Sequence, residues 1–178
     1  IKDIIEREDS ISVICETDNA NEAIDLLSKN KLDLAIIDIT IKGNVNGVEL
    51  VKAIKDRYPE INTLVLSMHN EALYAERSIR AGAKGYLMKE DAPKSIINAI
   101  YRIMEGDLFI SEETSRRIVN KLVQGSSDSI GLNIEKLSNR EFEIFRHIGN
   151  GFSSKEISKK LNLSVNTIES HRRNIREK

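Results

Sequence analysis

The segment "LAIIDIT" (residues 34–40) decides the fold, because it ends an apolar run on a single carboxylate, Asp38. Four consecutive apolar side chains precede Asp38, so the segment lacks the alternation of a strand that is half exposed to water. Such a run predicts a strand buried on both faces, as in parallel sheets covered by helices. Ligands bind such sheets at the carboxyl ends of the strands, where Asp38 stands.

Strand and helix patterns alternate outward from this segment over the first 110 residues. Further strands are predicted at residues 10–16, 61–68 and 83–89, and helices at residues 21–30, 48–58, 71–82 and 93–106. This alternation predicts an α/β fold, a flavodoxin-like doubly wound parallel sheet with right-handed crossovers. The opening "IKDIIERE" is typical of the end of a helix, so we expect a first strand to precede residue 1.

The second part of the chain has a different character. A helix is predicted at residues 112–123, and the stretch "QGSSDSIGLN" (124–133) has the composition of a flexible linker. Three short helices are then predicted at residues 138–151, 153–162 and 164–178, which would form a small all-α domain. We therefore expect a domain at 1–107, a connecting helix and linker at 108–136, and a second domain at 137–178.

Composition places the chain among globular proteins and hints at two modules. The 178 residues are 40% hydrophobic and 31% charged, and no apolar run reaches the ~20 residues that span a bilayer. A single cysteine, Cys15, excludes an internal disulfide and fits a cytoplasmic protein. Residues 1–110 hold 14 Lys and Arg against 19 Asp and Glu, whereas residues 138–178 hold 9 against 5. The basic tail suggests a polyanionic partner.

Three polar side chains stand at the ends of successive predicted strands: Asp38, Ser67 and Lys89. A carboxylate can act as a nucleophile toward phosphorus and form an acyl phosphate. An ammonium stabilises the anionic group that is transferred, and a hydroxyl can donate to one of its oxygens. Each residue alone is more often a solvated strand end. The three together favour phosphoryl transfer.

The stretches "LDLAIIDITIKGNVNGVEL", "TLVLSMHNE" and "SIRAGAKGYLMKED" resemble the receiver domain of bacterial two-component response regulators. The resemblance implies that Asp38 accepts phosphate from a sensor histidine kinase. It further implies that Ser67 is the switch hydroxyl, that Tyr86 is the aromatic residue that turns inward, and that Lys89 contacts the phosphate. Asp38 and the backbone carbonyl of Thr40 would bind Mg2+.

Two features depart from the receiver pattern. Receivers carry a pair of acidic residues after their first strand, and the 178 residues show no such pair. Mg2+ is therefore expected for the full-length chain and only weakly in residues 1–178. The loop after Asp38 has Lys42 where the family usually has proline, and Gly47 stands one residue later than usual.

The segment from residue 137 to 178, with "LSNRE", "EIS" and "VNTIESH", resembles the LuxR-type helix-turn-helix. The second helix has a narrow apolar stripe and an otherwise polar face, and such a helix fits the major groove of DNA. The residues predicted to bind DNA are Ser164, Asn166, Thr167, Glu169, Ser170, Arg172, Arg173 and Arg176. By analogy Glu169, Ser170 and Arg173 would face base edges. The family also continues into a fourth helix, so we expect further residues after Lys178.

The two resemblances together describe a NarL/FixJ-type response regulator, a transcription factor and not an enzyme. Phosphorylation of Asp38 would switch the chain, and a homodimer would bind double-stranded DNA at paired half-sites. An atypical regulator of the same architecture that binds DNA without phosphorylation remains an alternative. An aspartate-nucleophile phosphohydrolase and a module that does not bind DNA are further alternatives.

Overall fold

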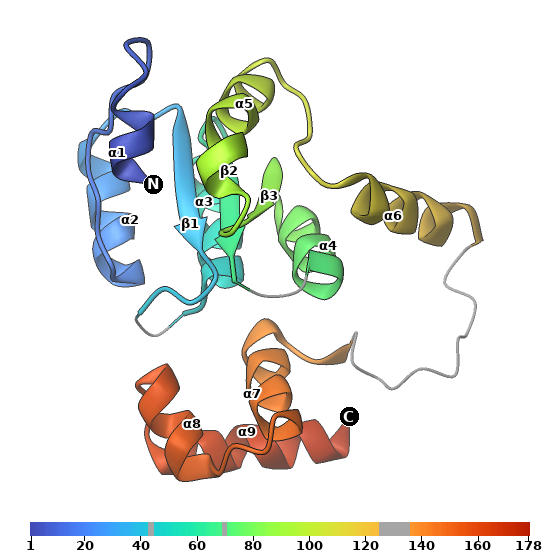
Figure 1. Cartoon of the computed structure of the whole chain (residues 1–178). Coiled ribbons are helices and arrows are strands. Elements are labelled where there is room, and N and C mark those ends of the chain that lie inside the picture. Colours follow the sequence, from blue (N-terminus) through green and yellow to red (C-terminus); the bar gives the residue numbers. More distant parts are fainter. Residues whose placement is uncertain (43–44, 69–70, 125–135) are drawn as a thin grey trace. The chain divides into compact units, whose positions relative to one another are not determined.

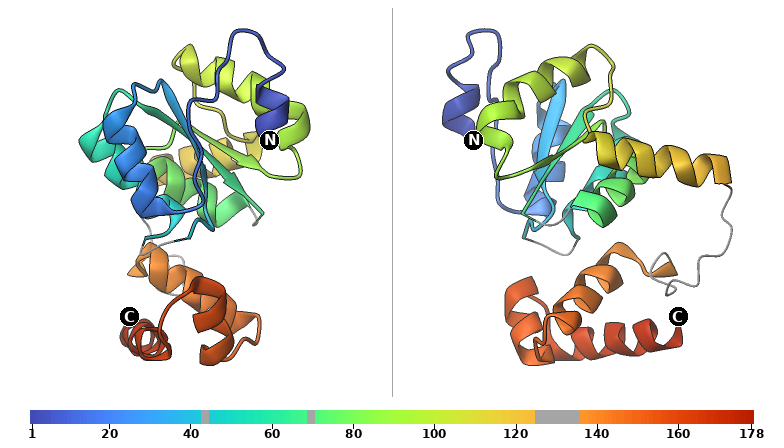
Figure 2. Two further views of the ribbon diagram at one scale, coloured as in Figure 1. Left: turned by 90° about the vertical axis from the view of Figure 1, so that its left-hand side faces the viewer. Right: turned by 45° about the vertical axis from the view of Figure 1, so that its right-hand side comes forward.

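The computed structural model describes residues 1–178 except residues 43–44, 69–70 and 125–135. Backbone contacts divide the chain into two compact units, Ile1–Ser126 and Ser127–Lys178. The first unit contains a sheet, and the described part of the second consists of helices (Figures 1 and 2). The predicted linker lies almost entirely outside the described residues. None of the described helices is long and apolar enough to cross a membrane.

The sheet of the first unit consists of three parallel strands in the order β1-β2-β3. Their bounds are β1 (Leu34–Asp38), β2 (Asn62–Ser67) and β3 (Gly85–Met88). The register pairs Asp38 with Leu66 and Ser67 with Met88, so the three strands end at one edge. This common edge positions the candidate site.

Helices cover both faces of the sheet (Figure 1). They are α1 (Lys2–Ile5), α2 (Ala20–Lys29), α3 (Gly47–Arg57), α4 (Glu71–Ala81), α5 (Ala92–Met104) and α6 (Glu112–Gln124). Helix α5 packs Ile96 and Ile103 against Leu64, Leu66 and Leu87 of the sheet, and α1 joins this core. Helix α3 contacts β1 and α4 contacts β3, while α2 packs on α3 and α6 on α4. The predicted doubly wound α/β fold is confirmed.

The prediction of a strand at residues 10–16 is wrong. Every second side chain from Ile11 to Thr17 is half-buried and those between are exposed. This alternation is typical of an extended segment. Ile11 and Val13 pack against the core beneath α5. However, no strand of the described chain pairs with this segment. The alternating pattern therefore produces an extended segment without the hydrogen-bond ladder that defines a strand.

The second unit contains α7 (Asn139–Gly149), α8 (Ser154–Leu161) and α9 (Val165–Glu177). Ile144, Ile157 and Ile168 contribute one buried side chain from each helix to its core. The sequence predicted these helices to within two residues at each end. The predicted small all-α domain is confirmed.

Candidate functional site

The carboxyl edge of the sheet brings together the three polar residues singled out from the sequence. Asp38 and Ser67 are the last residues of β1 and β2, and Lys89 follows the last residue of β3. The backbone N–H of Lys89 donates to the carbonyl oxygen of Ser67 at 2.8 Å, which continues the β2–β3 ladder. The parallel register thus places a carboxylate, a hydroxyl and an ammonium at one edge.

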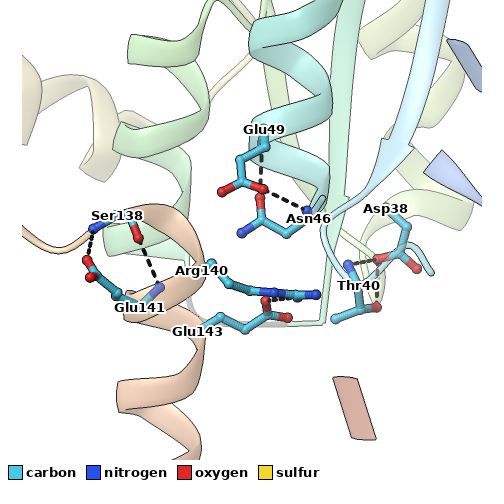
Figure 3. A network of polar contacts seen from close by, with 8 residues as sticks. All are labelled: Asp38, Thr40, Asn46, Glu49, Ser138, Arg140, Glu141 and Glu143. Carbon is cyan, nitrogen blue, oxygen red and sulfur yellow. Dashed lines mark hydrogen bonds and ion pairs between the residues drawn. The ribbon is translucent and has the colours of Figure 1, made fainter. Parts of the chain in front are cut away.

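The carboxylate of Asp38 is held through both of its oxygens. Oδ1 accepts hydrogen bonds from the backbone N–H and the hydroxyl of Thr40, each at 3.0 Å (Figure 3). Oδ2 is contacted by the ammonium of Lys89. The side chains of Asp38 and Lys89 are 35% and 29% exposed, so solvent and small solutes reach the pair. An accessible carboxylate beside a fixed cation suits an incoming anionic phosphoryl group.

Ser67 and Tyr86 lie deeper than the Asp38–Lys89 pair. Ser67 is fully buried, and Tyr86 is 2% exposed. The N–H of Tyr86 donates to the carbonyl oxygen of Phe109 at 2.8 Å, so the segment after α5 is hydrogen-bonded to β3. The described side-chain contacts therefore join Asp38, Thr40 and Lys89 directly, while Ser67 is connected to Lys89 through the backbone.

The start of α3 packs tightly against the end of β1. Asn46 and Glu49 form a capping box, in which each side chain accepts a hydrogen bond from the other's backbone N–H (Figure 3). A Cβ added at Gly47 would lie only 2.3 Å from the carbonyl oxygen of Asp38. Glycine is therefore the residue that lets the loop close against the strand.

Lys42, which replaces the proline usual in receivers, has a structural role. Its N–H donates to the carbonyl oxygen of Asp18 at 3.1 Å, and its ammonium lies 2.5 Å from the carboxylate of Asp18. Proline has no N–H and could not form the first bond. The hydrogen bond and charge of Lys42 hold the pKa of Asp18 below its ordinary value. Sequence reasoning missed this contact because no local pattern links the two positions.

The residues present do not fit a strong magnesium site. Mg2+ takes six oxygen ligands in a regular octahedron and is usually anchored by one or two carboxylates. Asp38 and the backbone carbonyl of Thr40 are the predicted ligands, and the carboxylate of Asp38 already engages Thr40 and Lys89. Within the described part of the chain, no three His, Cys, Asp or Glu side chains gather as metal ligands.

Local capping interactions build the second unit. Ser138 with Glu141 and Ser153 with Glu156 form capping boxes at the starts of α7 and α8 (Figure 3 shows the first). Asn162 ends α8 in the left-handed conformation, with φ of 52°, which turns the chain toward α9. The hydroxyl of Ser164 then accepts from the N–H of Thr167 at 3.0 Å and caps α9.

Acidic side chains in this unit are mostly engaged within it. Glu143 pairs with Arg140 at 2.7 Å (Figure 3), and Glu141 receives a hydrogen bond from Lys178 at 2.6 Å. Burial raises the pKa of Glu141, but the bonds from Lys178 and Ser138 outweigh it and hold the pKa below its ordinary value. Helix α9 itself presents two arginines and two glutamates to solvent: Glu169, Arg173, Arg176 and Glu177.

Helix α9 has one face in the core and the other in solvent. Ile168 and Ile175 pack against α7 and α8. Of the residues predicted to bind DNA, Thr167 and Arg172 are half-buried and six are exposed: Ser164, Asn166, Glu169, Ser170, Arg173 and Arg176. The structure adds one contact that sequence reasoning missed, because the hydroxyl of Ser154 in α8 donates to Glu169.

Two family models match the chain. Residues 1–101 match the response regulator receiver domain, and residues 135–178 match the bacterial regulatory proteins of the luxR family. The chain belongs to the response regulators. Its second unit is the LuxR-type DNA-binding domain of such a regulator, so the family predicted from the sequence is confirmed.

Relatives of this response regulator match 98% or more of its sequence. It is 37% identical to the fimbriae Z protein of Salmonella typhimurium, over 98% of this chain and 81% of the relative. It is 30% identical to the transcriptional regulatory protein DegU of Brevibacillus brevis, over 100% of this chain and 80% of the relative. This response regulator is thus a DNA-binding transcriptional regulator with a receiver domain.

Solved structures agree with this assignment. RcsB from Salmonella enterica serovar Typhimurium, bound to a promoter in the presence of the phosphomimetic BeF3−, matches with a TM-score of 0.61 and 27% identity, covering 96% of this chain and 80% of RcsB. A LuxR-family response regulator from Aurantimonas has the same score and identity, covering 68% of this chain and 86% of its own. The described fold is that of these regulators.

Proposed function

We propose that this response regulator is switched by transfer of a phosphoryl group from a sensor histidine kinase to Asp38. The contact between the partly exposed carboxylate of Asp38 and the ammonium of Lys89 supports this proposal most directly. A nucleophile for phosphorus must be reachable, and the charge that arrives with the phosphoryl group needs a fixed cation beside it.

The proposed transfer is a displacement at phosphorus. A carboxylate oxygen of Asp38 forms a bond to phosphorus, while the bond from phosphorus to the kinase histidine nitrogen breaks and the imidazole leaves. The acyl phosphate carries about two negative charges in place of the single charge of the carboxylate. Lys89 stays next to them, and the hydroxyl of Ser67 reorients to donate to a phosphate oxygen. Tyr86 repacks as Ser67 moves.

Magnesium is proposed to bind residues 1–178 weakly, through Asp38 and the carbonyl of Thr40. One carboxylate offers little of the oxygen shell that Mg2+ prefers. When bound, the ion would neutralise charge on the transferred group. Thr40 holds Oδ1 of Asp38 through its N–H and hydroxyl, so this residue orients the nucleophile without the ion.

Intact-mass measurement after incubation with acetyl phosphate tests the proposal. The parent chain should gain the mass of one phosphoryl group, and Asp38→Asn should gain none. Asp33→Asn is the matched control, because Asp33 is an exposed aspartate just before β1. Equal labelling of parent and Asp38→Asn would contradict the proposal. Repeating the incubation with EDTA or added Mg2+ measures how much the ion contributes.

We further propose that phosphorylation favours a homodimer in the cytoplasm that places two α9 helices on paired DNA half-sites. The polar face of α9 supports this, since it presents Arg173 and Arg176 to solvent. Binding to a random duplex should weaken steeply as salt rises, because neutralised phosphates release counterions. A chain that binds no duplex at low salt would contradict this part.

A further inference from the structure

A hydrogen bond between two helices fixes the position of one carboxylate on the DNA-binding unit. The hydroxyl of Ser154, the first residue of α8, donates to Oε1 of Glu169 in the second turn of α9. Glu169 is exposed and Ser154 is half-buried. A residue of α8 thus restrains Glu169, an exposed side chain of α9.

Glu169 has no evident role in balancing charge inside the unit. Among the described residues, no lysine or arginine forms an ion pair with it, although Arg172 and Arg173 follow within four positions. Glu141 and Glu143, by contrast, each have a basic partner. A carboxylate on a DNA-facing surface repels phosphates and weakens non-specific binding. Its presence there is explained if it reads a base.

Glu169 lies among the residues best placed to meet DNA. At 100° per residue, six side chains of α9 fall within an arc of about 120°. These are Asn166, Glu169, Ser170, Arg173, Arg176 and Glu177. Ile168 and Ile175 project from the opposite side into the core. Glu169 therefore belongs to the exposed face of α9, beside Arg176 at one side of the arc, and Arg173 lies at its centre.

The chemistry of the major groove selects the base. A carboxylate only accepts hydrogen bonds, and the N4 amine of cytosine is the donor that Glu reads there. With Oε1 occupied by Ser154, Oε2 is left to meet the amine. A free glutamate side chain loses much rotamer freedom on binding, and the bond from Ser154 restricts that freedom in advance.

We propose that Ser154 is a positioning residue for sequence recognition: it orients Glu169 so that Oε2 accepts a hydrogen bond from N4 of one cytosine in each half-site. This inference rests on the proposed DNA binding and specifies the base that the surface selects. Ser154 itself touches neither base nor phosphate.

Selection from a pool of random duplexes, with sequencing of the bound fraction, tests the inference. The parent chain should enrich cytosine at one position per half-site. Glu169→Gln should shift that position toward adenine, which an amide reads through N6 and N7. Ser154→Ala should reduce the cytosine preference by roughly three- to tenfold, since a hydrogen bond to a charged group is lost. Ser154→Thr keeps the hydroxyl and should retain the preference.

Controls separate positioning from folding and from general affinity. Ser115→Ala changes an exposed serine of the first unit and should leave the preference at the parental level. Ser154→Ala should melt like the parent and keep the parental salt dependence on an unselected duplex. An unchanged cytosine preference in Ser154→Ala, or an equal loss of affinity for all sequences, would overturn the inference. Failure of the parent to enrich any duplex would instead overturn the proposed DNA binding, and this inference with it.

Discussion

At the scale of single residues, each carboxylate oxygen of Asp38 has its own partner. Thr40 holds Oδ1 through two hydrogen bonds, and Lys89, which follows β3 on the far side of β2, contacts Oδ2. The first contact is local and fixes the rotamer. The second spans 51 positions and depends on the folded sheet. The reactivity proposed for Asp38 therefore depends on the parallel register as well as on its own carboxylate.

Replacing Lys89 by alanine should slow phosphorylation of Asp38 by roughly tenfold or more, because the fixed cation beside the arriving charge is lost. Labelling over time with acetyl phosphate, followed by intact mass, measures this rate. Lys94→Ala is the matched control, since Lys94 is an exposed lysine of α5. Parental labelling rates in Lys89→Ala would show that Lys89 does not assist the transfer.

Replacing Gly47 by alanine should destabilise the first unit by about 1–3 kcal/mol, because the new Cβ forces the loop away from β1. Tyrosine fluorescence during urea unfolding reports this unit selectively. All 4 tyrosines lie within it and the chain has no tryptophan.

Gly149→Ala is the control for Gly47→Ala. Gly149 is the last residue of α7, and nothing lies within 4 Å of an added Cβ there. Its tyrosine midpoint should equal that of the parent. If Gly47→Ala also unfolds at the parental midpoint, the loop accommodates a Cβ at residue 47, and its close approach to the carbonyl oxygen of Asp38 does not require glycine.

At the scale of elements, the capping box of α8 couples helix stability to pH. Hydrogen bonds from the side chain and backbone of Ser153 hold the pKa of Glu156 below its ordinary value. A carboxyl group with a lowered pKa in the folded state stabilises that state fully above its unfolded pKa. This stabilisation is lost as pH falls through the folded pKa. The stabilisation by Glu156 is therefore lost as the pH falls below about 4.5.

Ser153→Ala should raise the pKa of Glu156 toward its ordinary value, because the side-chain hydrogen bond to the carboxylate is removed. Titration of the glutamate carboxyl carbons by NMR measures this pKa directly. Ser12→Ala, which changes an exposed serine of the first unit, should leave the titration unchanged. The same pKa in Ser153→Ala and the parent would argue that another group sets it.

Two arginines of α9 should affect DNA binding differently. Arg173→Ala should reduce discrimination between sequences, because Arg173 is expected to face base edges. Arg176→Ala should weaken binding to all sequences and reduce the slope of log K against log salt by about 0.9, the value for one phosphate contact. Fluorescence anisotropy with selected and unselected duplexes measures both. Identical effects of the two variants would remove this division of roles.

Much of the fold followed from the sequence because apolar periodicity is a local signal. The helix at residues 153–162 was predicted from its apolar spacing, and α8 spans Ser154–Leu161. The strand at residues 10–16 was not realised, since a strand also needs a paired neighbour, which periodicity does not report. The contacts Lys42–Asp18 and Ser154–Glu169 were missed for the same reason. The two residues of each contact are 24 and 15 positions apart in the sequence, and only the folded chain brings them together.

At the scale of the whole molecule, opposite charges are separated between the two units. The receiver side is acidic and the α9 side is basic, as the counts for residues 1–110 and 138–178 show. Phosphorylation of Asp38 replaces the single charge of a carboxylate by about two, so the acidic side gains about one negative charge. A change at Asp38 can alter DNA binding only if it shifts an equilibrium between two states of the molecule that bind DNA differently. The proposed homodimer supplies such a pair of states.

Treatment with acetyl phosphate should therefore raise affinity for a selected duplex with two half-sites by roughly 5- to 150-fold, the usual range of coupling between sites. A duplex with one half-site should gain little, because a second subunit has nothing to bind. Asp38→Asn should show no gain on either duplex, while Asp33→Asn should respond like the parent. An equal rise in affinity for both duplexes would indicate that phosphorylation acts within a single chain and does not require a dimer. A gain in Asp38→Asn would separate DNA binding from Asp38 altogether.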